Sequence, residues 1–163
     1  MGNMAYSENI YAAVRQYFID DEAHFDEDEE NGYFLANYAV GKNDCPVSSA
    51  RLHFLIHSDG FTARLAIKGI KAVQKAFPYV GVLLTYINDG LRYGNFEMDN
   101  NDGEVAFKLS CIVPDDADLN YDYLDKVVCI GLSMLKRYAD ALVPIMLGYS
   151  VDPRAAYESI ENN

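Results

Sequence analysis

The stretch GNFEMDNNDGEVAFKLSCIV, residues 94–113, decides the fold because it predicts two β-strands joined by a polar turn. In its second half, apolar side chains occupy every other position, at Val105, Phe107, Leu109 and Cys111. Such alternation is typical of a strand with one buried and one wetter face. Long helical patterns lie on both sides, so this hairpin marks where the sheet meets the helices.

Three further strands are predicted upstream. Residues 32–40, which include YFLANYAV, are rich in aromatic and β-prone side chains. Residues 51–57 and 61–67 flank Ser58-Asp59-Gly60, and an Asp-Gly between two strand patterns predicts a tight hairpin. One face of this hairpin is apolar. The other face is more polar and carries His53, Leu55, His57, Thr62 and Arg64.

The helices are predicted from apolar side chains spaced three and four residues apart. Such stripes cover about residues 8–20, 79–91 and 121–142. Ser7 is the expected N-cap of the first helix, and Pro144 is expected to end or kink the third. Asp152-Pro153 predicts the start of a short C-terminal helix. Residues 68–77 fit either a helix or an extension of the preceding strand.

The order of these segments is helix, three strands, helix, two strands, helix and a short helical tail. Hairpins flanked by helices predict an α+β fold in two layers, with a five-stranded antiparallel sheet that carries its helices on one face. No repeat or linker divides the sequence, so we expect one domain over residues 1–163. The second face of the sheet is then either polar and solvated, or covered by a partner or a second copy.

The acidic character of the chain is concentrated in one segment. The formal net charge is -12, and eight of the 25 Asp and Glu residues lie between Asp20 and Glu30. Like charges at adjacent positions repel, so we expect residues 20–31 to form a solvated loop, with His24 an ordinary surface histidine. A weak divalent-cation site or a contact with a basic partner is the less favoured alternative. The same charge would repel a phosphate backbone, which argues against nucleic-acid binding.

Three features of the sequence predict where the protein resides. No stretch approaches the roughly 18–20 uninterrupted apolar residues of a membrane span. The opening residues, MGNMAYSENI, show no basic region followed by an apolar run, so we expect no secretory signal. Cys45, Cys111 and Cys129 have no disulfide or metal-site spacing. The last two fall in apolar patterns and are expected to be buried. We expect a reduced, cytoplasmic protein without membrane contact.

Two groups of side chains resemble metal sites but do not fit one. His53 and His57 would lie on one strand, where four residues span roughly 13 Å, too far for a single zinc ion. The run from Asp99 to Glu104 has calcium-ligand chemistry, but an EF-hand loop starting at Asp99 needs Gly at its sixth and Glu at its twelfth position. Gly103 is the fifth residue and Ser110 the twelfth. A hairpin turn explains this run, and we expect no metal ion.

Catalytic motifs are absent from the sequence. It contains no GxSxG, P-loop or GxGxxG pattern, and no cysteine has a neighbouring histidine in a recognised catalytic signature. We therefore expect no catalytic residues, no cofactor and no enzymatic activity.

Residues 87–113, INDGLRYGNFEMDNNDGEVAFKLSCIV, resemble the YbjN family, described as bacterial sensory-transduction regulators. Members of that family show a helix ending in Asn, a Gly-x-Phe-x-x-Asp strand, an Asp-Gly turn and a strand beginning Glu-Val. The corresponding residues here are Asn88, then Gly94, Phe96 and Asp99, then Asp102-Gly103, then Glu104-Val105. The tail GYSVDPRAAYESIE is similar to the family's ending, in which a proline opens a short helix. The resemblance covers about residues 33–160.

This resemblance implies a fold like that of type III secretion chaperones, with the order α-β-β-β-α-β-β-α. Those chaperones are small and acidic, are often dimeric, and bind extended segments of client proteins. We therefore expect a non-enzymatic protein-binding, chaperone-like or regulatory module that acts as a homodimer. The alternative is a small-molecule-sensing regulatory domain with its ligand between sheet and helix, and an enzyme acting through carboxylates ranks third. The acidic segment and residues 68–77 depart from the family pattern.

Overall fold

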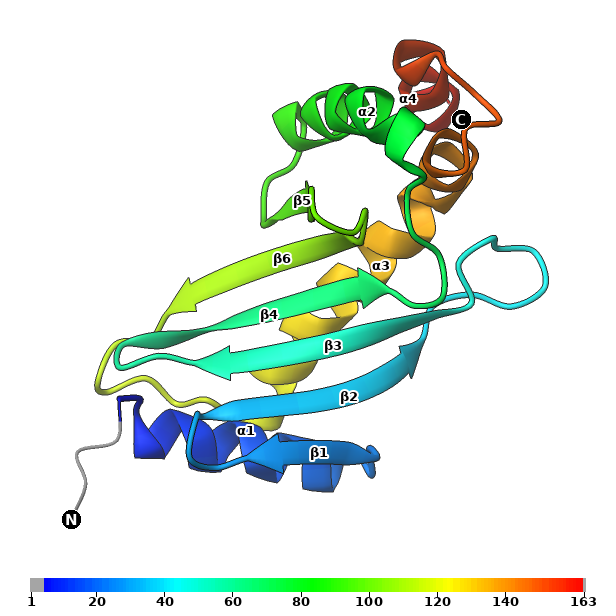
Figure 1. The fold of residues 1–163 in the computed structure, drawn as a ribbon. Coiled ribbons are helices and arrows are strands. Elements are labelled where there is room, and N and C mark those ends of the chain that lie inside the picture. Colours follow the sequence, from blue (N-terminus) through cyan, green and yellow to red (C-terminus); the bar gives the residue numbers. More distant parts are fainter. Residues whose placement is uncertain (1–4, 163) are drawn as a thin grey trace.

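The computed structural model describes residues 5–162, which form four α-helices, one 3₁₀-helix and a six-stranded sheet (Figure 1). Residues 1–4 lie outside this part, so the prediction about a secretory signal falls partly beyond it. The helices are α1 (Glu8–Asp20), η1 (Gln74–Ala76), α2 (Phe77–Asp89), α3 (Tyr121–Met146) and α4 (Pro153–Glu161). The strands are β1 (Phe25–Asp28), β2 (Tyr33–Ala39), β3 (Ser49–Ile56), β4 (Gly60–Ile67), β5 (Asn95–Met98) and β6 (Val105–Ile112).

All neighbouring strands are antiparallel, and their spatial order is β1-β2-β3-β4-β6-β5. The predicted class, an α+β fold built on an antiparallel sheet, is confirmed. The predicted number of five strands is wrong, because the acidic segment contributes a sixth strand, β1, at one edge of the sheet.

β1 forms inside the segment that the charge pattern predicts to be a solvated loop. Phe25 stacks on Phe18 of α1, with 5.2 Å between the ring centroids. Glu27 accepts hydrogen bonds at 2.9 Å from the hydroxyl of Tyr11 and from Nε of Arg15, both on α1. One aromatic contact and one carboxylate with two partners thus outweigh the repulsion between neighbouring acids. The loop prediction considered the charges and missed these contacts with α1.

The hydrophobic core lies between the sheet and the two helices that cover one of its faces, α1 and α3 (Figure 1). Phe18 of α1 meets Phe54 of β3 edge-on, with ring centroids 6.2 Å apart. α3 approaches β4 closely, since a Cβ atom at Gly131 would lie 2.4 Å from Cδ1 of Leu65. The predicted apolar face of the β3–β4 hairpin is confirmed, with Leu52, Phe54, Ile56, Phe61, Ala63, Leu65 and Ile67 all buried.

The helix ends follow the local signals with one difference. Ser7 and Asp152, the predicted N-caps, accept hydrogen bonds from backbone N–H groups in the first turns of α1 and α4. α3 continues past Pro144 to Met146. A proline in the last turn removes only one helical N–H donor, and the carbonyl of Pro144 accepts a bond from the N–H of Tyr149 at 2.9 Å.

The helices do not all lie on the sheet. α4 packs mainly against α2 and α3, and α2 packs against the edge strand β5, so a helical cluster extends beyond that edge (Figure 1). Residues 68–73 form neither of the two predicted elements and are irregular, whereas the helical alternative holds for the end of the segment, where η1 leads into α2 at Phe77.

Candidate functional site

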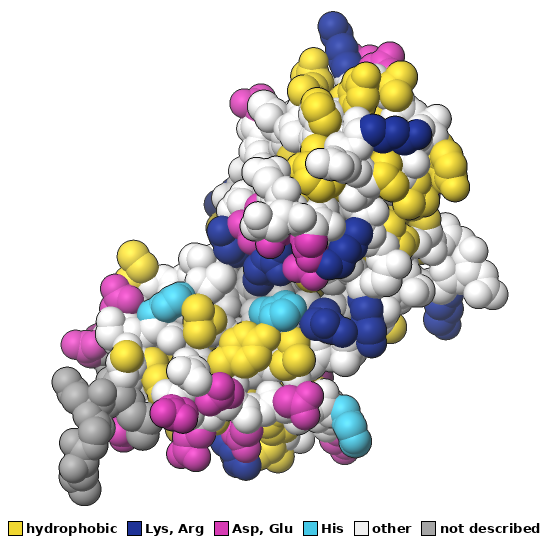
Figure 2. Space-filling view, in the orientation of Figure 1, with side chains coloured by type: hydrophobic (Ala, Val, Ile, Leu, Met, Phe, Trp, Pro, Cys, Tyr) yellow, Lys and Arg dark blue, Asp and Glu magenta, His cyan; other side chains and the backbone are white. Residues whose placement is uncertain are grey.

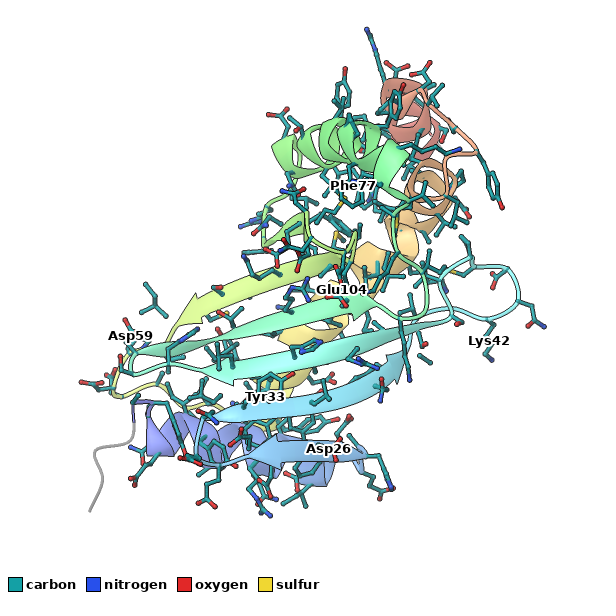
Figure 3. The ribbon with its side chains drawn as sticks, viewed as in Figure 1. Asp26, Tyr33, Lys42, Asp59, Phe77 and Glu104 are labelled. Atoms are coloured by element: carbon teal, nitrogen blue, oxygen red, sulfur yellow. The ribbon has the colours of Figure 1, made fainter. Side chains whose placement is uncertain are left out.

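The face of the sheet opposite α1 and α3, here called the open face, is covered by no helix within residues 5–162 (Figures 1 and 2). The pairing register aligns its side chains in rows across the strands. One row holds Tyr33, Leu55, Thr62 and Ser110, and the next holds Leu35, His53, Arg64 and Lys108. Figure 3 shows Tyr33 and Glu104 on this side of the molecule.

One half of the open face carries an ion-pair cluster of Arg64, Glu97, Glu104 and Lys108. Nε of Arg64 donates to Glu97 at 2.7 Å and Nη1 donates to Glu104 at 2.6 Å, while Lys108 pairs with the second oxygen of Glu97. Desolvation acts against the charge on Glu97, but hydrogen bonds from Lys108 and Arg64 outweigh it and hold the pKa of Glu97 below its usual value. Two cations and two anions therefore form a charge-balanced, half-buried group.

The two histidines of the open face have separate partners. Tyr33 hydrogen-bonds Nδ1 of His53, and burial lowers the pKa of that histidine. Nε2 of His57 bonds Thr62 at 2.9 Å, and Thr62 bonds Ser110 at 2.9 Å. Within residues 5–162, no group of three or more His, Cys, Asp or Glu side chains is arranged to hold a metal ion.

An apolar strip of Tyr33, Leu35 and Leu55 lies on the open face between the ion-pair cluster and β1. Leu55 is 40% exposed, and Tyr33 and Leu35 are half-buried. Asp28 and Asp26 of β1 pair in register with Tyr33 and Leu35 and so border the strip on the same face. Figure 2 shows hydrophobic side chains between histidine and acidic side chains in this region.

β6 has an unpaired edge over Leu109–Ile112, here called the free edge. β5 pairs only with Val105–Lys108, and no other strand within residues 5–162 continues beyond it. The N–H of Val113 bonds the carbonyl of Asp59 on the β4 side. Because hydrogen-bonding direction alternates along a strand, the backbone N–H and C=O groups of Ser110 and Ile112 point away from β4. Ile112 is 83% exposed.

The two outermost strands of the sheet, β1 and β5, are protected, although β2 extends beyond β1 at Asn37–Ala39. β1 is four residues long and acidic, features that discourage strand pairing. On β5, the side chain of Asn88 occupies the place of a neighbouring strand: Nδ2 donates to the carbonyl of Phe96 at 2.9 Å and Oδ1 accepts from its N–H at 2.7 Å. This double hydrogen bond gives Asn88, one of the residues carrying the YbjN resemblance, a structural role. The free edge of β6 lacks both kinds of protection.

The run from Asp99 to Glu104 is the predicted hairpin turn. The carboxylate of Asp99 accepts a bond from the N–H of Asn101 at 2.8 Å, and Asp102 accepts one from the N–H of Glu104 at 3.0 Å. Asp102 also pairs with Lys71. These carboxylates are occupied by the turn itself, as expected for a hairpin rather than a calcium loop.

The three cysteines are free thiols, and each belongs to a different segment of the fold. Cys45 is half-buried in the loop between β2 and β3, and Cys111 is half-buried on β6. The expectation that Cys129 is buried is wrong: it is exposed on α3, where it contacts Asp125 with 3.6 Å between Sγ and the carboxylate. The preceding residue, Val128, lies on the buried face of α3 instead.

A cavity of about 560 Å³ lies in the helical cluster, between α3, α4 and the segment after α2. Arg92, Lys126 and Arg137 are among its lining residues. The alternative hypothesis of a ligand site placed it between sheet and helix, and this cavity is instead bounded by helices and a loop. No motif in the sequence marks these residues, since they come from separate elements.

Within residues 5–162, the fold and these features define a class of protein: an α+β domain whose antiparallel sheet has an open face and an unpaired edge along β6. No family model matches the chain, and no curated protein sequence is similar to it. The resemblance to the YbjN family and to type III secretion chaperones stays a prediction. None of the helices within residues 5–162 is both long and apolar enough to span a membrane.

Proposed function

We propose that the protein is a non-enzymatic, chaperone-like or regulatory binding module that holds an extended segment of a partner protein along the free edge of β6. The observation that carries this proposal is the pair of outward-facing residues Ser110 and Ile112, whose backbone groups have no strand beside them within residues 5–162. An extended peptide can add a strand to such an edge by main-chain hydrogen bonds.

The surroundings of the free edge indicate the chemistry of the partner. Side chains of an added strand alternate in direction, so half of them would contact the open face beside Ser110 and Lys108. The net charge of -12 attracts basic segments and repels acidic ones. We expect a segment of four or more residues with few acids and an excess of Lys and Arg nearby.

A homodimer is the assembly that we propose for this module. Tyr79, Val82 and Tyr86 form an exposed stripe on α2, here called the α2 patch, and Val82 is 48% exposed. Asp89, at the end of the helix, is its one charged residue. Because two chains with a net charge of -12 repel each other, an uncharged patch is the surface through which copies meet at least electrostatic cost. Free cysteines suit a reducing, cytoplasmic location.

The arrangement of acids supports a non-enzymatic role. Glu97 and Glu104 face one depression on the open face, as paired catalytic carboxylates would. Both are bound by Arg64, and the low pKa of Glu97 keeps it ionised at neutral pH. Glu97 is therefore not placed to give up a proton to a substrate.

Two variants at one position test the proposal. Ile112→Pro removes an outward N–H that has no partner among residues 5–162, whereas Ile112→Ala trims the side chain and keeps that N–H. Proteins captured from a bacterial lysate by the wild-type chain would be titrated against both variants after circular dichroism has shown that each is folded. We expect binding to weaken at least tenfold with proline and to change little with alanine.

Hydrogen exchange provides a second measurement on the same complex. A bound segment should slow exchange at Ser110 and Ile112, because their N–H groups become hydrogen-bonded. The proposal is overturned if every captured protein binds the proline variant as tightly as the wild type, or if exchange at the free edge is unaffected.

A further inference from the structure

We propose that the cavity in the helical cluster binds a small organic anion with an apolar body. This site is separate from the free edge and the open face. Its volume of about 560 Å³ falls within the range of roughly 300–1,000 Å³ typical of small-molecule sites.

The charge on the cavity wall is opposite to that of the protein. Acidic residues outnumber basic ones 25 to 13 in the chain, yet the charged residues lining the cavity are Arg92, Lys126, Arg137 and Glu161. Three cations and one anion leave the wall positive. Asp125, in contact with Cys129 at the rim, weakens this field but does not line the cavity.

Of the three cations in the cavity wall, one is ion-paired with a carboxylate and two can bind a ligand. Nη2 of Arg137 pairs with Glu161 at 3.1 Å. No carboxylate within residues 5–162 forms an ion pair with Arg92 or Lys126. The guanidinium of Arg92 lies 5.2 Å from the ring centre of Tyr93. Two cations from different elements, both exposed at one cavity, can bind an anion together.

The remainder of the wall is suited to an apolar body. Leu91, Ile130 and Met134 line it together with the rings of Tyr138 and Tyr157. Such surfaces contribute hydrophobic contact, whereas a few polar groups fix a ligand's orientation. A bare inorganic anion would leave this apolar surface in water, so we infer a ligand that combines a carboxylate, sulfonate or phosphate with an aliphatic or aromatic portion.

The far side of the cavity is held in place by contacts between α3 and α4. The hydroxyl of Tyr138 donates to Glu161 at 2.8 Å, beside the Arg137 pair. Tyr157 stacks on Tyr86 of α2, with 5.8 Å between the ring centroids. A wall held by three helices is pre-formed, which lowers the entropic cost of binding.

The test uses a pair of fluorescent probes with nearly the same aromatic body. Anilinonaphthalene sulfonate carries one negative charge, and phenylnaphthylamine is its uncharged counterpart. We expect the sulfonate to bind saturably with one molecule per chain and at least tenfold more tightly than the amine. Added salt should weaken binding of the sulfonate more than binding of the amine, because salt screens ionic contacts.

Matched variants locate the site. The Arg92→Gln and Lys126→Gln double variant should weaken sulfonate binding about tenfold or more, since each charge-assisted contact contributes of the order of a tenfold change in affinity. Lys136→Gln, which removes one positive charge from α3 outside the cavity, should leave binding unaltered. Bound sulfonate should also slow alkylation of Cys129 and not of Cys45, as measured by mass spectrometry.

The proposal is wrong if the sulfonate shows no saturable binding, if the two probes bind equally, or if the double variant binds like Lys136→Gln. Equal binding of both probes would point to an exposed surface such as the α2 patch. Arg92 and Lys126 are exposed, and unaltered thermal unfolding of the variants would exclude loss of folding as the cause.

Discussion

Arg64 on β4 and Glu97 on β5 form an ion pair at 2.7 Å, although they are 33 positions apart in the sequence and β6 separates their strands. The pair spans β6 on the open face and meets Glu104 and Lys108 there. It links the β3–β4 hairpin to the β5–β6 hairpin through side chains as well as backbone.

Arg64→Met should destabilise the protein by about 1–3 kcal/mol at pH 7, because it leaves two half-buried carboxylates with fewer partners. The contribution of Glu97, whose folded pKa is lowered, is present above its unfolded pKa of about 4.3 and is lost as pH falls through the folded value. The difference between variant and wild type should therefore shrink below about pH 4. Urea denaturation at pH 7 and at low pH measures this. Arg154→Met, which breaks an exposed pair, is the control and should cost less than about 0.5 kcal/mol.

Gly103→Ala should destabilise the β5–β6 hairpin by about 2 kcal/mol or more. Gly103 has φ +75°, which an L-residue adopts at a cost of roughly 1–2 kcal/mol, and its new Cβ would lie 2.4 Å from the carbonyl oxygen of Ala72. Gly81→Ala provides the contrast, since it lies within α2 and a Cβ there meets no atom within 4 Å. That change should stabilise the protein by about 0.5–1 kcal/mol. Thermal unfolding midpoints that move in the same direction would contradict this account.

Phe25→Ala should release β1 from the sheet. Phe25 is half-buried, so we expect a loss of about 2 kcal/mol, below the roughly 3–5 kcal/mol of a fully buried phenylalanine. Hydrogen exchange should accelerate over Phe25–Asp28 while amides of β3 and β4 remain protected. Asp26→Asn, which changes charge on the same strand, should leave protection intact. Unchanged exchange in Phe25→Ala would show that the aromatic contact does not hold the strand.

Val82→Glu should convert the proposed dimer into a monomer, because it places a charge in the α2 patch. The control is Ile19→Glu on α1, where the native side chain is 45% exposed on a different helix. Light scattering over a range of protein concentrations distinguishes the two variants. A wild-type protein that remains monomeric, or a Val82→Glu variant that remains dimeric, would contradict an interface through α2.

The elements that could be predicted from sequence are those whose causes are local. Alternation of apolar residues and the Asp59-Gly60 turn specify the β3–β4 hairpin, and the run from Asp99 to Gly103 specifies the next one. Ser7 and Asp152 cap their helices through side chains that reach only three residues along the chain. In each case the interacting groups are neighbours in sequence, so the pattern itself contains the physical cause.

The candidate site depends on contacts between distant residues, and the sequence patterns did not reveal it. β1 forms because Phe25 reaches Phe18 on α1, which outweighs the repulsion that the acidic run suggested. The cations of the cavity come from the segment after α2 and from α3, and they share a wall only after the helices have packed.

The sequence by itself determined the α+β class, the two principal hairpins and the caps, because short-range spacing and turn chemistry control them. Tertiary structure alone decided that β5 pairs with β6 only as far as Lys108, so that Ser110 and Ile112 are left unpaired within residues 5–162. It also decided that the side chain of Asn88 protects the edge of β5. Strand register and helix docking set these features by bringing together residues that are far apart along the chain. That is why the fold class could be predicted from the sequence while the free edge of β6 could not.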